Sequence, residues 1–335
     1  MMKKLLAACL LYAACHPAFA VTTFKIATIA PDGTIWMVAL RQGADEIARR
    51  TEGRVNLRFF PGGVMGNDQS VLRKIRIGQL QGGVIISGGL SEIYPDIDLY
   101  NVPFIFRSYK EVDYVRERMD PVLLKGLAER GFVGFGLSEG GFAYLMSNRP
   151  IRSIDDLKGR KVWVPQDDVI SRVVFDAIGV TPIPLPLTDV LTGLQTGLID
   201  TVAGSAIGAI ALQWHTQVKY LVDEPLVYLY AAVIIDSKSF AKLSAADQAV
   251  VQQVLTEVVH KLNQQTRSDD AAARQALKAQ GIAFVSPTED SRRREEEIKK
   301  EAERRLLQQH ILSPTLLQTL KDQLTAQRQA ASPHD

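Results

Sequence analysis

Cysteine is nearly absent from this sequence. Cys9 and Cys15 are the only two, and both lie among the first 20 of 335 residues. From residue 21 onward, disulfide bonds, thiol catalysis and cysteine-ligated metals are therefore excluded. Histidine is also scarce, with five residues, and none pair at the HExxH spacing of a zinc site. We expect no metal and no other cofactor.

The sequence also lacks an excess of charge of one sign. Lys and Arg number 39, and Asp and Glu number 37. If Lys3 and Lys4 are removed with a cleaved leader, the two counts become equal. A chain without a basic excess has no field that attracts nucleic acid or an anionic membrane. We therefore expect no nucleic-acid partner.

Long apolar runs are missing as well, apart from one short stretch near the start. Lys3 and Lys4 precede an apolar stretch about half as long as the ~20 residues of a membrane-spanning helix, and small residues follow up to Ala20. This pattern is typical of a secretory signal peptide, cleaved near Ala20. Lipid attachment at Cys15 is the weaker alternative, because Tyr12 stands where such sites have a small aliphatic residue. We expect an exported protein.

Strand-like and helix-like segments alternate after the leader. Residues 24–27 read as a strand, Thr34 precedes a helix with apolar residues at three- and four-residue steps, and alternation at 55–59 indicates a second strand. Further segments are expected at 68–77 (helix), 83–86 (strand), 110–130 (helix), 161–164 (strand), 169–177 (helix), 189–196 (helix) and 197–202 (turn and strand). This order predicts an α/β fold with parallel-rich sheets.

Two longer extended segments, 142–148 and 227–235, separate the alternating units, and the chain becomes helical after Ser244. We interpret the two segments as crossings between two lobes, which also act as a hinge. The predicted organisation is a signal peptide at 1–20, lobe I at 21–145 plus about 230–262, lobe II at 146–229 plus about 263–325, and a frayed tail at 326–335.

Several short motifs follow one another along the chain: TEGRV at 51–55, FPGG at 60–63, NVPFIF at 101–106, RPI at 149–151, DLKG at 156–159 and LQTGLID at 194–200. In this order they resemble the motifs of the solute receptors that serve TRAP transporters, the DctP family. The resemblance covers residues 24–285. It implies a two-lobed periplasmic binding-protein fold with a long C-terminal helical region, a ligand in the cleft between the lobes, and delivery to TRAP membrane permease subunits in the periplasm.

Three departures from the family pattern fall where the family grips its substrate. Trp163 stands where the strand after DLKG usually presents an Arg that clamps a carboxylate. Ala143 stands where a second Arg often follows Gly-Phe, and Ala203-Gly204-Ser205 replaces a more polar segment. An indole has one N–H and a large apolar face, so it cannot make the two parallel hydrogen bonds of a guanidinium. We therefore expect a neutral or largely apolar ligand.

If the lobes close as the resemblance implies, a set of mainly aromatic residues lines the cleft. These predicted ligand-binding residues are Trp163, Phe142, Ala143, Tyr144, Trp36, Phe104, Gln166, Ser205 and Trp214. Asp167 and Asp168 are expected to cap a helix. If one of them faces Trp163, a cationic ligand of the betaine type becomes a minority alternative.

Other readings stay open. One is an organic-acid receptor that uses a different cation, such as Arg172 or Arg107. Another is a periplasmic lipid carrier or a ligand-sensing partner of a membrane receptor. Residues 134–140 (GFGLSEG) resemble a dinucleotide-binding turn, but they lack the GxGxxG spacing and an extended segment follows them. No nucleophile and base can be named, so we do not expect an enzyme. We expect a monomer or a dimer.

Overall fold

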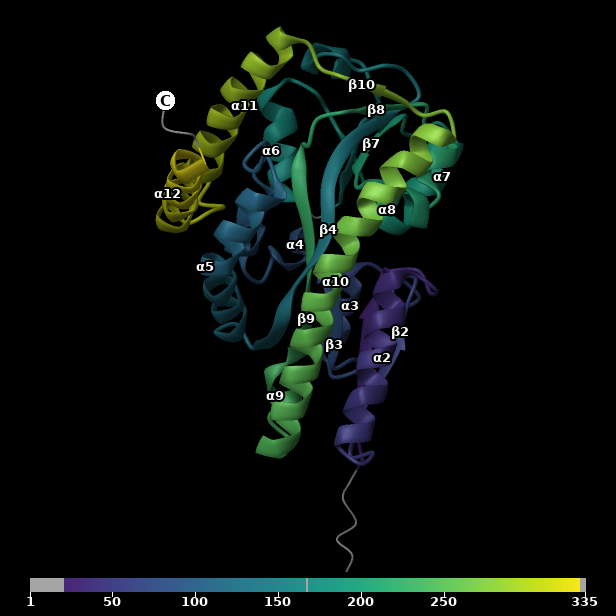
Figure 1. The fold of residues 1–335 in the computed structure, drawn as a ribbon, viewed down its shortest axis with the longest axis vertical. Helices are drawn as coiled ribbons and strands as arrows, with labels where there is room; N and C mark the ends of the chain where they lie inside the picture. The colour runs from purple at the N-terminus through teal and green to yellow at the C-terminus, as the bar shows by residue number, and fades with distance from the viewer. Residues whose placement is uncertain (1–20, 167, 332–335) are drawn as a thin grey trace, which may run out of the picture.

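A mixed eight-stranded sheet runs along the molecule (Figure 1). The computed structural model describes residues 21–166 and 168–331, so the predicted signal peptide, with Cys9 and Cys15, and Asp167 lie outside the described residues. The strands are β1 (Thr22–Thr28), β2 (Val55–Phe60), β3 (Gly82–Ile86), β4 (Phe132–Ser147), β5 (Trp163–Pro165), β6 (Ile183–Leu185), β7 (Thr201–Gly204), β8 (Tyr220–Val222), β9 (Val227–Asp236) and β10 (Ala283–Val285). The order in the large sheet is β10-β8-β4-β9-β3-β1-β2, with β7 also on β4, and β5 and β6 form a separate pair.

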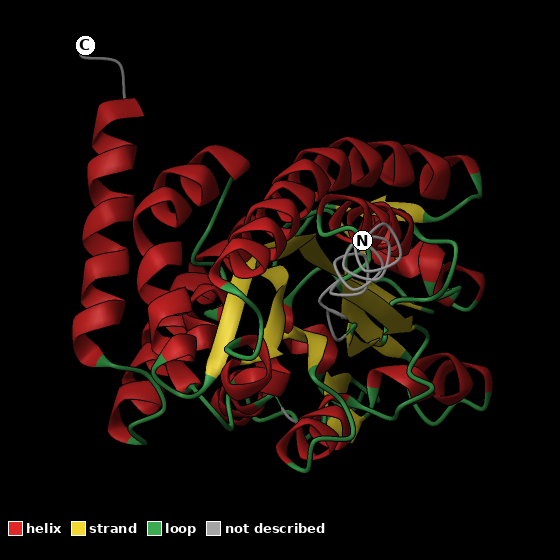
Figure 2. Ribbon diagram, turned by 90° about the horizontal axis from the view of Figure 1, so that it is seen from below, coloured by secondary structure: helices red, strands yellow, loops and turns green. Residues whose placement is uncertain are grey.

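Helices cover both faces of this sheet (Figure 2). The α-helices are α2 (Ile35–Arg50), α3 (Asp68–Arg76), α4 (Ser87–Leu90), α5 (Tyr109–Ala128), α6 (Val169–Ala177), α7 (Val190–Gln195), α8 (Ala206–Ala211), α9 (Ser237–Phe240), α10 (Ala245–Ala279), α11 (Glu289–Gln308) and α12 (Pro314–Ala331). Short 3-10 helices are η1 (Pro95–Asn101), η2 (Ile154–Leu157), η3 (Leu187–Asp189) and η4 (Trp214–Thr216). The α/β class and the alternation expected from the sequence are confirmed.

Two long strands connect the two ends of the sheet. The predicted extended segments are parts of β4 and β9, which pair with each other in antiparallel fashion. β9 also pairs with β3 at one end, while the end of β4 pairs with β7 and β8 at the other. α10, 35 residues long, runs beside both ends (Figure 1). The exact lobe boundaries remain a prediction.

The Gly-rich stretch of β4 bends the strand. Register shifts against β9 occur between Gly134 and Leu137 and between Glu139 and Gly141. Gly136 and Gly141 have φ angles of 130° and 86°, in the region that L side chains rarely adopt. Residues 134–140 are therefore an irregular strand segment, which confirms that they do not form a dinucleotide-binding turn.

Residues 326–331 differ from the expectation of a frayed tail. They continue α12, and Arg328 makes an ion pair with the buried carboxylate of Glu111 on α5 at 2.8 Å. The same guanidinium donates to the backbone oxygen of Ile105 at 3.0 Å. These contacts between distant segments stabilise the end of the helix, and no local sequence pattern predicts them.

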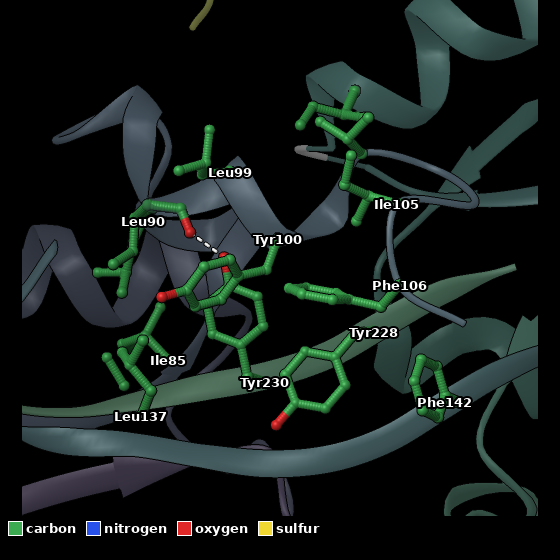
Figure 3. Close-up of a cluster of buried hydrophobic side chains, with 14 of the residues drawn as sticks. Ile85, Leu90, Leu99, Tyr100, Ile105, Phe106, Leu137, Phe142, Tyr228 and Tyr230 are labelled. Atoms are coloured by element: carbon green, nitrogen blue, oxygen red, sulfur yellow. Dashed lines mark hydrogen bonds between the residues drawn. The ribbon is translucent and has the colours of Figure 1, made fainter. Parts of the chain in front are cut away.

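An aromatic core lies beside the crossing strands (Figure 3). Tyr228 of β9 packs edge-on against Phe106 and Phe142, with ring centroids 5.8 and 5.6 Å apart. Tyr230 stacks beside Tyr228 and donates its hydroxyl to the backbone oxygen of Ile97. These side chains fill the side of the crossing strands that faces η1 and α5, so the strands are packed firmly on that side.

Candidate ligand-binding cavity

A cavity of about 260 Å³ lies among elements from both ends of the sheet. β1, α2, β3 and α4 contribute from one end, β5, α6, β7 and α8 from the other, and β4 and β9 lie between them. Most of the wall is apolar. The polar residues that line it, by side chain or by backbone, are Thr28, Ser87, Asn101, Ser138, Glu139, Asp168, Ser171, Ser205 and Tyr230. The volume is near the lower limit of ordinary small-molecule sites, roughly 300 Å³.

Five of the predicted residues lie in this wall. They are Trp36, Ala143, Trp163, Ser205 and Trp214. Because they come from α2, β4, β5, the start of α8 and η4, only the fold brings them together. Ala203 and Gly204 also line the cavity. All three positions that depart from the family pattern therefore meet at one cavity.

Trp163 has no free hydrogen-bond donor. It is buried, and its Nε1 donates to the backbone oxygen of Leu185 at 3.0 Å. Its ring meets that of Trp214 edge-to-face, with centroids 5.3 Å apart. The indole therefore offers the cavity only apolar surface and its π-electron face.

Phe142 and Tyr144 do not line the cavity, which corrects the expectation from the sequence. In the antiparallel register, Ala143 pairs with Val227 and both line the cavity, whereas Phe142 pairs with Tyr228 and faces the aromatic core (Figure 3). Successive side chains of a strand point to opposite faces, so adjacent residues cannot all reach one cavity. Tyr144 lies under the guanidinium of Arg274, 4.3 Å from its ring centroid.

Phe104 and Gln166 also lie outside this cavity. Phe104 is in the turn after η1, with φ at 55°, and its N–H donates to the backbone oxygen of Leu226 at 2.8 Å. Gln166 lines a neighbouring cavity of about 30 Å³, which shares Asp168 with the larger one. The family motif identified Phe104 as a candidate residue, but it did not predict the direction of its side chain.

No Lys, Arg or His side chain lines the larger cavity among residues 21–166 and 168–331. The two cations named for an organic-acid receptor lie elsewhere: Arg172 donates to the backbone oxygen of Gln166, and Arg107 pairs with Glu296 at 3.0 Å. The charged residues in the wall are both acidic, Glu139 and Asp168.

The carboxylate of Glu139 is paired with two arginine side chains behind the wall. Its carboxylate accepts from Arg116 of α5 at 3.0 Å and from Arg267 of α10 at 2.5 and 2.8 Å. Its backbone N–H donates to the Oδ1 atom of Asn263 at 2.8 Å. Two cations neutralise this buried carboxylate, so it serves to join β4 to two helices.

Asp168 has a different environment. It caps α6, as expected, and its carboxylate accepts from the backbone N–H and the hydroxyl of Ser171. No ion pair forms with it among the described residues. Burial raises the pKa of Asp168, while the hydrogen bonds from Ser171 oppose that shift. Sequence reasoning identified the cap but left its exposure to the cavity open.

Behind the wall, a second acid lies near Asp168. Burial raises the pKa of Asp98 well above its ordinary value, and the charge of Asp168 raises it further. Asn101, which lines the cavity, donates from Nδ2 to the hydroxyl of Ser87 at 2.7 Å and to Asp98 at 3.3 Å. The Oδ2 atom of Asp98 and the Oδ1 atom of Asn101 are buried without a partner. Sequence reasoning missed these acceptors, because Asp-x-x-Asn in a short helix carries no distinctive signal.

Residues 136–140 (GLSEG) match the GxSxG letters of serine hydrolases. That motif requires a sharp turn from a strand into a helix. Here the residues lie inside β4, and Ser138 pairs with Ala231 of β9. Within the described residues, no group of three His, Cys, Asp or Glu side chains is suited to a metal ion. None of the described helices has the length and apolar character needed to cross a membrane.

The family model for bacterial extracellular solute-binding proteins, family 7, named DctP, matches residues 26–309. The chain belongs to this family. It is thus a TRAP-type periplasmic solute-binding protein, which is a receptor family and not an enzyme family. The resemblance found in the short motifs is confirmed.

Three similar proteins have acids as their ligands. The C4-dicarboxylate-binding periplasmic protein DctP of Rhodobacter capsulatus is 23% identical over 261 residues, covering 76% of this chain and 77% of that protein. A TRAP solute-binding protein of Xanthobacter autotrophicus, solved with bound β-D-galacturonate, has 22% identity and a TM-score of 0.80, covering 91% of this chain and 98% of the other. The sugar-acid-binding protein of Advenella mimigardefordensis, in complex with galactonate, has 20% identity and a TM-score of 0.85, covering 92% and 99%.

Proposed function

We propose that this receptor captures a small ligand that is neutral or largely apolar, encloses it in the described cavity, and delivers it to a TRAP permease. The observation that carries this proposal is the cavity wall: it has no cationic side chain among the described residues, and two acidic residues lie in it. A carboxylate buried there would lose its hydration without gaining a cation, at a cost of several kcal/mol.

The remaining wall favours apolar contact. Trp163, Trp214 and the aliphatic residues of β9 supply the surface, and a ligand that buries about 200 Å² of apolar area gains about 5 kcal/mol before the cost of association. Contacts to elements from both ends of the sheet select a closed form, with β4 and β9 as the hinge. That closed form is the state proposed to dock on the membrane subunits.

The organic-acid alternative draws on the relatives, which bind galacturonate, galactonate and C4-dicarboxylates. It requires a cation that reaches the ligand. Arg172 and Arg107 both lie outside the wall, and Arg116 and Arg267 are held by carboxylates. We therefore place this alternative second.

Replacing Trp163 tests the proposal directly. Trp163→Arg introduces the guanidinium that the family usually has there. It should lower the affinity for the native ligand and permit galacturonate to bind. Because Asp168 lines the same cavity, the double variant Trp163→Arg with Asp168→Asn removes a competing carboxylate and should bind the acid better still. Isothermal titration calorimetry measures each affinity.

Trp163→Phe is the matched control, since it keeps an aromatic ring and adds no charge. It should bind no galacturonate. If the wild-type protein binds galacturonate, galactonate or a C4-dicarboxylate tightly, the proposal of a neutral or largely apolar ligand is wrong.

A further inference from the structure

One end of the cavity is built from hydrogen-bond acceptors. Asp168 and Asn101 lie in the wall there, and Asp98 lies directly behind Asn101. The backbone of Gly88 brings α4 against Asp168, since a Cβ atom on Gly88 would lie 3.6 Å from that of Asp168. Segments that are far apart in the sequence thus meet at this end, which we call the acceptor end, defined as Asp98, Asn101 and Asp168.

The orientation of Asn101 is fixed by its neighbours. Its Nδ2 donates both to Ser87 and to the carboxylate of Asp98, so Oδ1 is the amide atom left over. Asn101 is 8% exposed, and this Oδ1 atom has no partner among the described residues. A buried acceptor without a donor costs about 1–3 kcal/mol, which a ligand that supplies an N–H recovers.

Neither Asp98 nor Asp168 makes an ion pair within residues 21–166 and 168–331, and the charge of Arg172 acts on Asp168 only from a distance. Arg172, one turn after Asp168 on α6, turns to the backbone oxygen of Gln166 instead. The groups around Asp98 are the hydroxyls of Ser87 and Ser91, the amide of Asn101 and the phenol of Tyr230. A buried acid, Asp98, close to a partly exposed acid, Asp168, with no ion pair to either among the described residues, forms an environment that attracts a positive charge.

Resting on the proposed function, we propose that the largely apolar ligand carries a protonated amine, which binds at the acceptor end and donates N–H bonds to Asp168 and to Oδ1 of Asn101. Its apolar body then lies along the indole of Trp163 and the aliphatic wall. Asp98 acts as a positioning residue, because it accepts a hydrogen bond from the amide of Asn101 and so fixes where Oδ1 of Asn101 lies. The aromatic face of Trp163 also favours a cation in the same cavity.

Three probes of matched shape separate the possibilities: 2-phenylethylamine, 2-phenylethanol and 3-phenylpropionate. Each is titrated into the purified full protein by calorimetry. The amine should bind at least about tenfold tighter than the alcohol, which corresponds to one charge-assisted hydrogen bond. The acid should bind most weakly.

Asp168→Asn removes the charge and keeps a residue that caps helices equally well. It should lower the affinity for the amine about tenfold and change the affinity for the alcohol by no more than about twofold. Asp236→Asn is the matched control: Asp236 caps α9 through Ser239, outside the cavity wall, so its replacement should change neither affinity. Asp98→Asn should lower the affinity for the amine less than Asp168→Asn does.

The outcomes distinguish this inference from the proposed function. If the alcohol binds as tightly as the amine, or if Asp168→Asn leaves the amine unchanged, the amine inference is overturned while the apolar-ligand proposal stands. If the acid binds tightest, both fail. Mass spectrometry of the molecule released on gentle denaturation gives an independent test: a basic amine supports the inference, and a carboxylate without an amine overturns it.

Discussion

Two acidic residues of the same cavity wall, Glu139 and Asp168, have opposite surroundings. Glu139 is held by Arg116 and Arg267, whereas Asp168 has no ion pair among the described residues and lies near a second acid, Asp98. Glu139 is 2% exposed, whereas Asp168 is half-buried, so the two also differ in their access to the cavity. The first is neutralised from within the protein and joins β4 to α5 and α10. The second is left to interact with whatever enters the cavity.

This difference separates an acid that stabilises the fold from an acid that is open to the cavity. Removing one member of a buried ion pair lowers the stability of the protein, because the other charge is left buried without a partner. An acid without a cation has no such partner, so its removal relieves a cost and instead changes what the cavity accepts. Three substitutions test that distinction.

The largest effect is expected for Glu139→Gln. It leaves Arg116 and Arg267 without their shared carboxylate, and we expect a loss of about 3 kcal/mol in the free energy of unfolding. Urea denaturation followed by circular dichroism measures it. A loss below about 1 kcal/mol would show that the remaining partners, Asp113 and Asp120, compensate, and the contrast between the two acids would collapse.

A change of opposite sign is expected for Asp98→Asn. The pKa of Asp98 is raised in the folded protein by burial and by Asp168, so the folded state holds a proton more strongly than the unfolded state. Stability therefore falls as pH rises from about 4 through the raised pKa. Asn does not titrate, so the variant should lose this part of the slope and gain about 1 kcal/mol at neutral pH.

The measurement is the unfolding free energy of wild type and variant at several pH values. A variant with the same slope as wild type would mean that Asp98 is not the titrating group. Asp120→Asn is the comparison for the sign of the effect at neutral pH: burial raises the pKa of Asp120 as well, but Asp120 accepts from Tyr100 and Arg116, so its loss should destabilise the fold.

The smallest effect is expected for Asp113→Asn. Asp113 pairs with the same Arg267 at 2.5 Å, but its side chain is 60% exposed. Solvent screens such a pair, so we expect a loss of about 0.5 kcal/mol, measured by the same denaturation. If Asp113→Asn costs as much as Glu139→Gln, then burial is not what gives the inner pair its strength.

Much of the local structure was predictable from the sequence. The caps at Thr34, Asp168 and Ser244, and the alternating apolar residues of β2, act over a few residues, so their patterns are visible in a single chain. The candidate site was predictable only in part. Trp163 and Ala143 were placed correctly in the wall because motifs fix their positions, whereas Phe142 and Tyr144 required knowledge of the register between β4 and β9.

The sequence by itself determined the α/β class, the family and the absence of cysteine after residue 20, because composition, periodicity and motif order are properties of the chain alone. Only the tertiary structure decided which carboxylate is paired. Arg116, Glu139 and Arg267 are distant in the sequence, as are Asp98 and Asp168, and their interactions depend on distances that exist only once the strands have crossed and the helices have packed.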